Sequence, residues 1–309
     1  MAKTALILGA TGGAGGETAR ALVRHGWTVR GLTRKPRDGE NIDWRLGDAL
    51  DRQDVLRAAE GVDVIVHAVN PPGYRNWAGT VLPMIENSIA AAEANDARLA
   101  LPGTIYNYDP RITPVAYPDT PQHPNTRKGA IRAALEHRME AANIRSLILR
   151  CGDFFGPYSG NNWLAQGMIA PGKPVTSITT PGKPGVGHAW AYLPDVGETF
   201  ARLLDEEDRL PRFARYHFNG YWDADGTGFA AAVAEAAGKP GLRPKSLPWA
   251  LLPLAAPFNP TLRELIEMKP FWRHPIRLDN RALIEAIGDE PHTPLDKALA
   301  DTLHALGCL

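Results

Sequence analysis

The sequence predicts an α/β protein built on a doubly wound parallel sheet with a smaller C-terminal lobe. Short apolar runs alternate with amphipathic stretches: the runs lie at 5–8, 28–32, 62–67 and 98–101, and the stretches near 14–25, 51–60, 77–95 and 126–142. Such alternation is typical of parallel strands joined by crossover helices. The length of 309 residues also suits one sheet plus a second lobe, because single cores stop growing at about 250 to 300 residues.

The expected domain boundaries follow from a change in composition. One more buried strand over 146–150 completes the predicted sheet, and Gly, Pro, Asn and Thr are frequent from 152 to 187. A segment of that composition favours long loops over regular layers. We therefore expect a first domain over 1–151, to which 188–206 returns, and a substrate-binding lobe made of 152–187 and 207–309.

Charge and cysteine content restrict the partners. The 34 Lys and Arg residues equal the 34 Asp and Glu residues, so no field of one sign attracts nucleic acid or an anionic membrane. Cys151 and Cys308 are too few for a disulfide framework and lack the spacing of a metal site. No apolar run has the length of a signal peptide core or a membrane span. We expect a cytoplasmic protein with a small-molecule substrate and no bound metal.

A glycine-rich turn follows the first apolar run directly. Gly9, Gly12 and Gly15 stand between this strand and the first helix. In a Rossmann turn the first glycine permits a tight bend, the second lets the backbone approach a pyrophosphate, and the third lets the helix pack on the sheet. The alternative is an ordinary strand-to-helix turn, but this position favours a dinucleotide site. Its other expected members are Ala10, Thr11 and Gly13.

The residues after the second strand bear on the choice of dinucleotide. In NAD-binding proteins an acidic residue at this point normally binds the adenosine ribose. Here Arg34 and Lys35 follow the strand, which is the chemistry that a 2′-phosphate requires, so we expect NADP(H) in preference to NAD(H). The alternative is a solvated basic turn. Further on, Asp48 beside Ala49 either accepts from the adenine amino group or caps the following helix.

The combined motifs resemble the short-chain dehydrogenase/reductase superfamily, and within it the extended, epimerase/dehydratase-like branch. They are Gly9-Ala10-Thr11-Gly12 with Gly15, Gly47-Asp48, residues 63–68, Arg150 with Phe155-Gly156-Pro157, and residues 192–196. The likeness covers most of residues 1–205 and is weaker beyond. It implies a Rossmann fold with a small substrate lobe. It also implies that Ala68, Val69 and Asn70 lie beside the cofactor and that 151–154, starting at Cys151, lie near the nicotinamide.

The sequence departs from this family at its proton-transfer residues. The resemblance implies a serine or threonine after the fifth strand and a Tyr-x-x-x-Lys on the next helix. Here Pro124 takes the place of the tyrosine, while Lys128 keeps the place of the lysine. Pro102, expected beside the cofactor, takes the serine position, and Thr104 lies two residues further on. The usual acid–base group is therefore missing, and Thr104 is one candidate to replace it.

Lys128 is expected to bind the nicotinamide ribose. It precedes Ile131, Leu135 and Met139 at helical spacing, so it lies on the apolar side of its helix, where an unpaired ammonium is costly. The alternative is a lysine that reaches solvent past the helix end.

Tyr106 is the second candidate proton donor. It lies just beyond the fifth strand, at the sheet edge where ligands of open α/β sheets bind. Packing in a proline-containing loop explains it equally well, and is the favoured interpretation for Tyr108. His188 alternates with Trp190 and Tyr192 as in a strand, and either lines the substrate lobe or packs in the core.

These residues predict an NADP(H)-dependent oxidoreductase that reduces a carbonyl or related group on a small organic molecule. One alternative is a sugar-nucleotide epimerase or dehydratase with bound NAD. Another is a non-catalytic sensor or scaffold that binds NADP(H), for which the missing tyrosine is the evidence. Helices near 78–95 and 126–142 are a possible homodimer interface, since Val81, Ile85 and Ile89 form a stripe, although the stripe equally suits packing on the sheet.

Overall fold

The centre of the protein is a parallel sheet whose strand order reverses beside the first strand. The computed structural model describes residues 2–71, 77–158, 160, 162–258 and 260–309. Within them the main sheet has seven strands in the order β11-β7-β5-β4-β1-β2-β3, and all neighbours are parallel. The strands are β1 (Thr4–Leu8), β2 (Thr28–Thr33), β3 (Ile42–Leu46), β4 (Val64–His67), β5 (Arg98–Thr104), β7 (Ser146–Cys151) and β11 (Phe213–His217).

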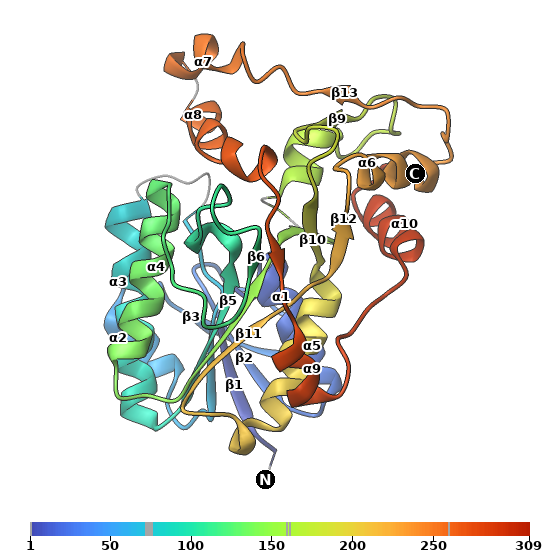
Figure 1. Ribbon diagram of the computed structural model, residues 1–309. Coiled ribbons are helices and arrows are strands. Elements are labelled where there is room, and N and C mark those ends of the chain that lie inside the picture. Colours follow the sequence, from blue (N-terminus) through green and yellow to red (C-terminus); the bar gives the residue numbers. More distant parts are fainter. Residues whose placement is uncertain (1, 72–76, 159, 161, 259) are drawn as a thin grey trace.

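Helices cover both faces of this sheet (Figure 1). One face carries α1 (Gly13–Arg24) and α5 (Leu193–Asp205), and the other carries α2 (Arg52–Ala58), α3 (Trp77–Asn95) and α4 (Arg127–Ala141). Each layer has its own apolar core against the sheet. The predicted class, a doubly wound Rossmann sheet, is therefore confirmed.

The seventh strand differs from the sequence expectation, which ended the sheet at residue 150. Strand β11 pairs with β7 along its whole length, from Phe213 opposite Ser146 to His217 opposite Arg150. All six residues of β7 are buried, so an edge position there would leave buried backbone groups without partners. Helix α9 (Arg281–Ile287) also packs on this layer through Leu283. Parts of 207–309 thus lie in the Rossmann layer.

A smaller lobe stands above the carboxyl ends of the strands. It contains a three-stranded sheet of β8 (Asp153–Phe155), β10 (His188–Tyr192) and β12 (Tyr221–Asp223), with α6 (Gly228–Ala236) and α10 (Leu295–Ala305) beside it. Stacked aromatic rings fill its core; the Trp190 and Phe229 ring centroids, for example, lie 3.9 Å apart. A short helix, α7 (Leu252–Ala255), and then α8 (Pro260–Glu267) follow later in the chain.

Short elements complete the lobe and its connections. Two parallel pairs join distant segments: β6 (Val115–Ala116) with β14 (Arg277–Leu278), and β9 (Thr179–Thr180) with β13 (Lys245–Ser246). The single-turn helices are η2 (Ile105–Asn107), η3 (Leu164–Met168), η4 (Glu207–Arg209), η5 (Ala256–Phe258) and η6 (Lys269–Trp272).

The apolar stripe on α3 faces the sheet. Val81 and Ile85 are buried in the core between α3 and the strands, and Ile89 packs against the same core. The second interpretation of the stripe therefore holds, and these side chains supply no dimer surface. In the part of the chain that the structure describes, we find no helix both long and apolar enough to span a bilayer.

Candidate functional site

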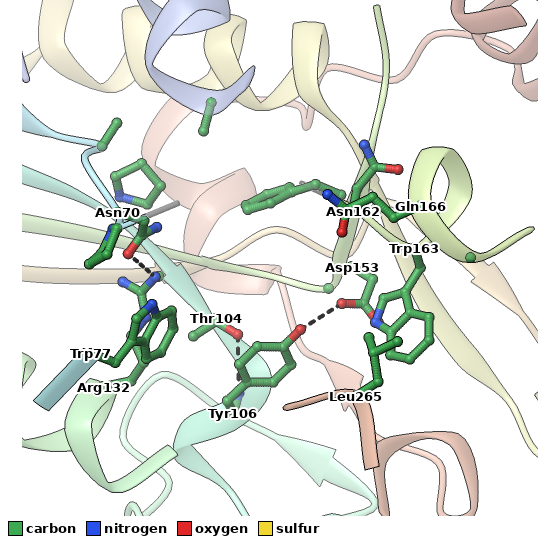
Figure 2. Close-up of a pocket in the computed structure, with 18 of the residues that line it drawn as sticks. Asn70, Trp77, Thr104, Tyr106, Arg132, Asp153, Asn162, Trp163, Gln166 and Leu265 are labelled. Carbon is green, nitrogen blue, oxygen red and sulfur yellow. Dashed lines mark hydrogen bonds between the residues drawn. The ribbon is translucent and has the colours of Figure 1, made fainter. Parts of the chain in front are cut away.

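A cleft opens at the carboxyl ends of β4, β5 and β7, the edge where ligands of doubly wound sheets bind (Figure 2). Its walls come from the start of α1, from β4 and β5, from residues 152–154, and from η3 and α8. The cleft encloses about 1150 Å³ of space, including its open mouth. It therefore lies between the Rossmann layer and the smaller lobe.

The glycine turn borders this cleft, and its shape requires glycine. A Cβ on Gly9, whose φ is +91°, would lie 2.6 Å from the carbonyl oxygen of Ala68. A Cβ on Gly15 would lie 2.4 Å from the carbonyl oxygen of Gly9. Helix α1 begins after Gly12 with no side-chain cap, and Ala14 in its first turn lines the cleft. The turn therefore fits the pyrophosphate of a dinucleotide.

The remaining members of the expected turn lie around it. Ala10 is buried under the helix start, while Thr11 and Gly12 are exposed and Gly13 begins α1. From β4 and β5, Ala68, Asn70 and Pro102 line the cleft. Val69 packs against the core beneath them.

The residues expected at the adenosine end lie after β2 and β3. Arg34 and Lys35 are both exposed, and the Thr33 hydroxyl donates to the Lys35 carbonyl oxygen at 2.9 Å. Asp48 accepts from the Leu50 amide at 3.0 Å. The helix cap that was one alternative for Asp48 belongs to Asp51, which accepts from two amides of α2. Ala49 is buried.

Tyr106 begins a chain of polar groups inside the cleft. Its hydroxyl donates to Asp153 Oδ1 at 2.9 Å, and Asp153 Oδ2 lies 2.8 Å from His188 Nε2. Asp153 and His188 are only 6% and 4% exposed. Figure 2 shows the Tyr106 ring between the two walls of the cleft with its hydroxyl directed at Asp153. The arrangement can pass a proton between the cleft and a buried carboxylate.

Two structural features hold the hydrogen-bonded side chains of Tyr106, Asp153 and His188 in place. Strands β8 and β10 are parallel neighbours with Trp190 opposite Asp153, so the register brings His188 beside the carboxylate. The His188 ring stacks on Trp272 with centroids 3.7 Å apart. The sequence analysis placed Asp153 within the segment 151–154 expected near the nicotinamide, but gave it no catalytic role.

Thr104 and Lys128 have other partners. The Thr104 hydroxyl lines the cleft but accepts from the Tyr106 amide at 3.2 Å, which caps the turn η2. Lys128 is not among the described residues that line the cleft. Its ammonium lies 2.5 Å from Glu264 Oε2 and 2.9 Å from Glu267 Oε2, both on α8. Lys128 thus joins α4 to α8 through ion pairs, and its contact with a ribose stays a prediction.

Arg132 lines the cleft one turn further along α4, and sequence reasoning missed it. It donates to Asn70 Oδ1 at 3.0 Å, and its guanidinium carbon lies 5.1 Å from the centre of the Trp77 ring. His67 lies nearby, with Nδ1 2.8 Å from the Ser88 hydroxyl. Burial, and then the charge of Arg132, lower the pKa of His67 to about 3, so its ring is neutral near pH 7.

Several expected or alternative residues lie in the core instead. The Cys151 side chain is fully buried below the sheet edge, and burial raises its pKa, although Gly152, Asp153 and Phe154 do line the cleft. Tyr108 is buried and pairs with Arg150, as its packing interpretation predicted.

The comparisons with known proteins agree with this architecture. The model of the NAD dependent epimerase/dehydratase family matches residues 5–217. The chain belongs to that family. No curated protein matches the sequence significantly.

Solved structures similar to this family member share its fold. Bordetella bronchiseptica WbmH in complex with NAD⁺ has 19% identity and a TM-score of 0.73, with 99% of this chain and 98% of that chain covered. UDP-glucuronic acid 4-epimerase from Bacillus cereus in complex with NAD has 15% identity and a TM-score of 0.75, with 98% and 96% covered. UDP-glucose 4-epimerase from Bifidobacterium longum in complex with NAD⁺ and UDP has 13% identity and a TM-score of 0.73, with 98% of both chains covered.

Membership in the NAD dependent epimerase/dehydratase family revises the sequence interpretation. The family is one of enzymes that use a nicotinamide dinucleotide, as expected. It favours the epimerase/dehydratase alternative over the carbonyl reductase that the sequence analysis placed first.

Proposed function

We propose that the protein moves a hydride between a nicotinamide dinucleotide and a hydroxyl-bearing carbon of a small polar substrate, and returns it before the product leaves. The observation that carries this proposal is the Tyr106–Asp153–His188 chain in the cleft. Family membership supports return of the hydride, because epimerases and dehydratases make no net use of their cofactor. Nucleotide-linked sugars are the first substrates to test, since similar folds are named for acting on them.

The residues that would hold the dinucleotide are those of the glycine turn and the end of β4. The turn from Gly9 to Gly15 fits the pyrophosphate, and Ala68, Val69 and Asn70 would lie beside the nicotinamide half. When bound, the nicotinamide accepts a hydride from the substrate carbon and gives it back. The protein must therefore orient the substrate and move one proton.

Tyr106 and Asp153 supply the route for that proton. When the alcohol is oxidised, its hydroxyl proton passes to Tyr106 Oη while the Tyr106 proton passes to Asp153 Oδ1. The substrate thus loses a hydride and a proton together and becomes a carbonyl, and the reverse transfer restores the alcohol. His188 at Asp153 Oδ2 fixes the carboxylate orientation.

The substrate side of the cleft combines polar side chains with the apolar side chains of Phe154, Trp163 and Leu265. Asp153, Asn162 and Gln166 come from the segment 152–187, which supports the proposal that this segment binds the substrate. Trp249, Trp272 and Phe271 lie in the core of the lobe. The cleft therefore offers hydrogen-bonding groups to a polar substrate beside an apolar surface.

For the cofactor we propose a preference for NADP(H), carried by exposed Arg34 and Lys35 after β2. The NAD complexes among the similar structures favour the opposite choice. We expect NADPH to bind at least about tenfold tighter than NADH in calorimetry, a difference of about 1.4 kcal/mol. The variant Arg34→Ala/Lys35→Ala should lose that difference and keep its NADH affinity. Equal affinities in the wild-type protein would refute the preference.

A net reductase is the second candidate. The basic pair Arg34 and Lys35 favours it, because a site that selects the 2′-phosphate suits an exchangeable NADPH.

The deciding experiment incubates the protein with either oxidised cofactor and a panel of UDP-sugars carrying deuterium at the oxidised carbon. Isomerised or dehydrated product that retains deuterium, with no rise in absorbance at 340 nm, supports the first proposal. A parallel incubation contains NADPH or NADH and simple carbonyl compounds, and loss of absorbance at 340 nm there supports the reductase. Cofactor binding with no turnover of any substrate overturns both, in favour of a sensor.

A further inference from the structure

The cleft has an apolar surface next to its reactive tyrosine. Trp163, which directly precedes η3, and Leu265, on α8, both line the cleft. Figure 2 shows both side chains beside Asp153, on the side to which the Tyr106 hydroxyl points. Because Tyr106 Oη lies only 2.9 Å from Asp153 Oδ1, a substrate hydroxyl at Tyr106 brings the rest of the substrate close to Trp163 and Leu265.

Aromatic packing within the lobe holds Trp163 in place. Its ring centroid lies 5.0 Å from that of Trp272 and 6.3 Å from that of Trp249, and Trp163 is only 8% exposed. A side chain packed in this way presents a fixed edge to the cleft. A ligand that binds there pays little for ordering the protein.

Leu265 is held against the same core by its helix. It is half-buried and packs on the aromatic cluster of the lobe. The carboxylates on either side of it along α8 are fastened to α4, since the Lys128 ammonium lies 2.5 Å from Glu264 Oε2 and 2.9 Å from Glu267 Oε2. These ion pairs keep Leu265 at the cleft.

The polar side chains of this wall make hydrogen bonds within their own segment. Asn162 is 9% exposed, and its Oδ1 accepts from the Ala165 amide at 2.8 Å. Gln166 Nε2 donates to the Gly160 carbonyl oxygen at 3.4 Å. The Asp153 carboxylate, which accepts from Tyr106, repels an anionic group beside the reacting carbon. The wall therefore favours an uncharged group of low polarity.

The cofactor belongs to the other wall of the cleft. There Ala68 touches the glycine turn, because a Cβ on Gly9 would lie 2.6 Å from the Ala68 carbonyl oxygen. Figure 2 places Asn70 on this wall, across the cleft from Trp163 and Leu265. The apolar surface is thus on the side that faces the substrate.

We propose that Trp163 and Leu265 form a binding site for an apolar ring of the substrate. The substrate is then an uncharged secondary alcohol, or its ketone, with a ring next to the reacting carbon. Its hydroxyl lies at Tyr106 and its ring on Trp163 and Leu265, where contact removes apolar surface of both partners from water. The inference rests on the proposed hydride transfer and narrows its substrate class.

Calorimetry with saturating reduced cofactor tests the proposal, because an alcohol cannot give a hydride to a reduced nicotinamide. The probes are α-tetralol, which is a secondary alcohol beside an aromatic ring, the uncharged polyol inositol, and UDP-glucose. We expect α-tetralol to bind at least about tenfold tighter than either of the other two.

Variants of α8 locate the ring. Leu265→Gln should weaken α-tetralol about tenfold, because it places an amide on the apolar surface, and should leave the affinity for reduced cofactor within about twofold. Trp163→Leu should weaken α-tetralol as well. Ile266→Gln is the matched control, since Ile266 is the next residue on α8, is half-buried, and is not among the described residues that line the cleft.

Each of three results overturns the proposal. Inositol or UDP-glucose bound as tightly as α-tetralol would assign the cleft to a polyol or charged substrate. An α-tetralol affinity that is unchanged in Leu265→Gln would place the ring elsewhere. A loss of cofactor affinity in Leu265→Gln would assign the apolar surface to the nicotinamide. Because no hydride moves in these measurements, failure of the hydride-transfer proposal would leave their result unaffected.

Discussion

Among single residues, the proposed mechanism uses a tyrosine–carboxylate pair, Tyr106 and Asp153, in place of the tyrosine–lysine pair that the family resemblance implies. Tyr106 approaches the cleft from the end of β5, whereas the missing tyrosine would have come from the segment before α4, where Pro124 stands. An ammonium partner stabilises a phenolate, but Asp153 accepts the phenolic proton. Proton transfer through Tyr106 therefore depends on the carboxylate.

We expect Tyr106→Phe to keep cofactor affinity and to lose turnover by about 10²- to 10⁴-fold, because a proton donor acts mainly in the transition state. Asp153→Asn should lose a similar amount, and the double variant little more, since the two groups act as one unit. Steady-state kinetics with the active substrate and calorimetry with the cofactor make the measurement. Tyr117→Phe is the control, an exposed tyrosine outside the cleft lining. A kinetically silent Tyr106→Phe would remove Tyr106 from the mechanism.

At the scale of elements, close packing between helices sets the geometry below the cleft. Helix α5 crosses α1 where Gly197 meets the backbone of Glu17. A Cβ on Gly197 would lie 2.6 Å from the carbonyl oxygen of Glu17. A second close contact positions Tyr106, since a Cβ on Gly129 of α4 would lie 2.1 Å from the Tyr106 carbonyl oxygen. Both contacts are with backbone atoms, which cannot rotate away as a side chain does.

Gly197→Ala should therefore lower the free energy of unfolding by about 1–3 kcal/mol, the usual cost of overpacking a core. Gly241→Ala is the matched control, because a Cβ there meets nothing within 4 Å and its φ is not in the left-handed region. Urea unfolding at one pH compares the two variants. Equal midpoints would show that α1 and α5 separate easily and that their contact does not fix the layer.

In the molecule as a whole, a buried polar network joins helix α4 to two neighbouring strands of the main sheet, β7 and β11. Arg150 on β7 donates to Glu136 on α4 at 2.6 Å and lies 3.2 Å from His217 Nε2 on β11. Burial, then the charge of Arg150, lower the pKa of His217 to about 3. With His67, the fold thus holds two histidines neutral at pH values where an unfolded chain would charge them.

This predicts a loss of stability in acid. Between the unfolded pKa of about 6.5 and the folded pKa of about 3, the unfolded chain binds a proton that the folded chain does not. Stability must fall as the pH falls through that range, by about 1.4 kcal/mol per pH unit for each histidine. His67→Asn should reduce the loss between pH 7 and pH 5 by about 2 kcal/mol.

Urea unfolding of each protein at pH 7 and at pH 5 measures this loss. Because the losses of the variant and the wild-type protein are compared, any effect of the substitution on stability at pH 7 cancels. His137→Asn is the control, because that side chain is 65% exposed on α4. An unchanged pH dependence in His67→Asn would mean that the His67 ring takes up its proton without unfolding.

The Rossmann layer is predictable from the sequence, because its signals are local. Alternating apolar runs and amphipathic stretches predicted five strands of the main sheet, β1, β2, β4, β5 and β7, and their helices within a few residues, and the spacing of Gly9, Gly12 and Gly15 predicted the turn. A strand period, a helix period and a tight bend each depend on neighbours a few residues away. The motifs of the first 205 residues likewise gave the family.

Only the tertiary structure decided which residues meet in the cleft. Strand β11 joins the sheet by pairing with β7 across more than sixty residues of chain, and its own sequence, with Arg215 at the centre, gives a weak strand signal. Asp153 meets His188 only through the register of β8 and β10. Lys128 and Arg132 have the same charge and the same helix face, and α8, far along the chain, decides that one is held in an ion pair while the other reaches the cleft. Long-range pairing of this kind leaves no periodic trace in sequence, because its partners are set by the packing of whole elements.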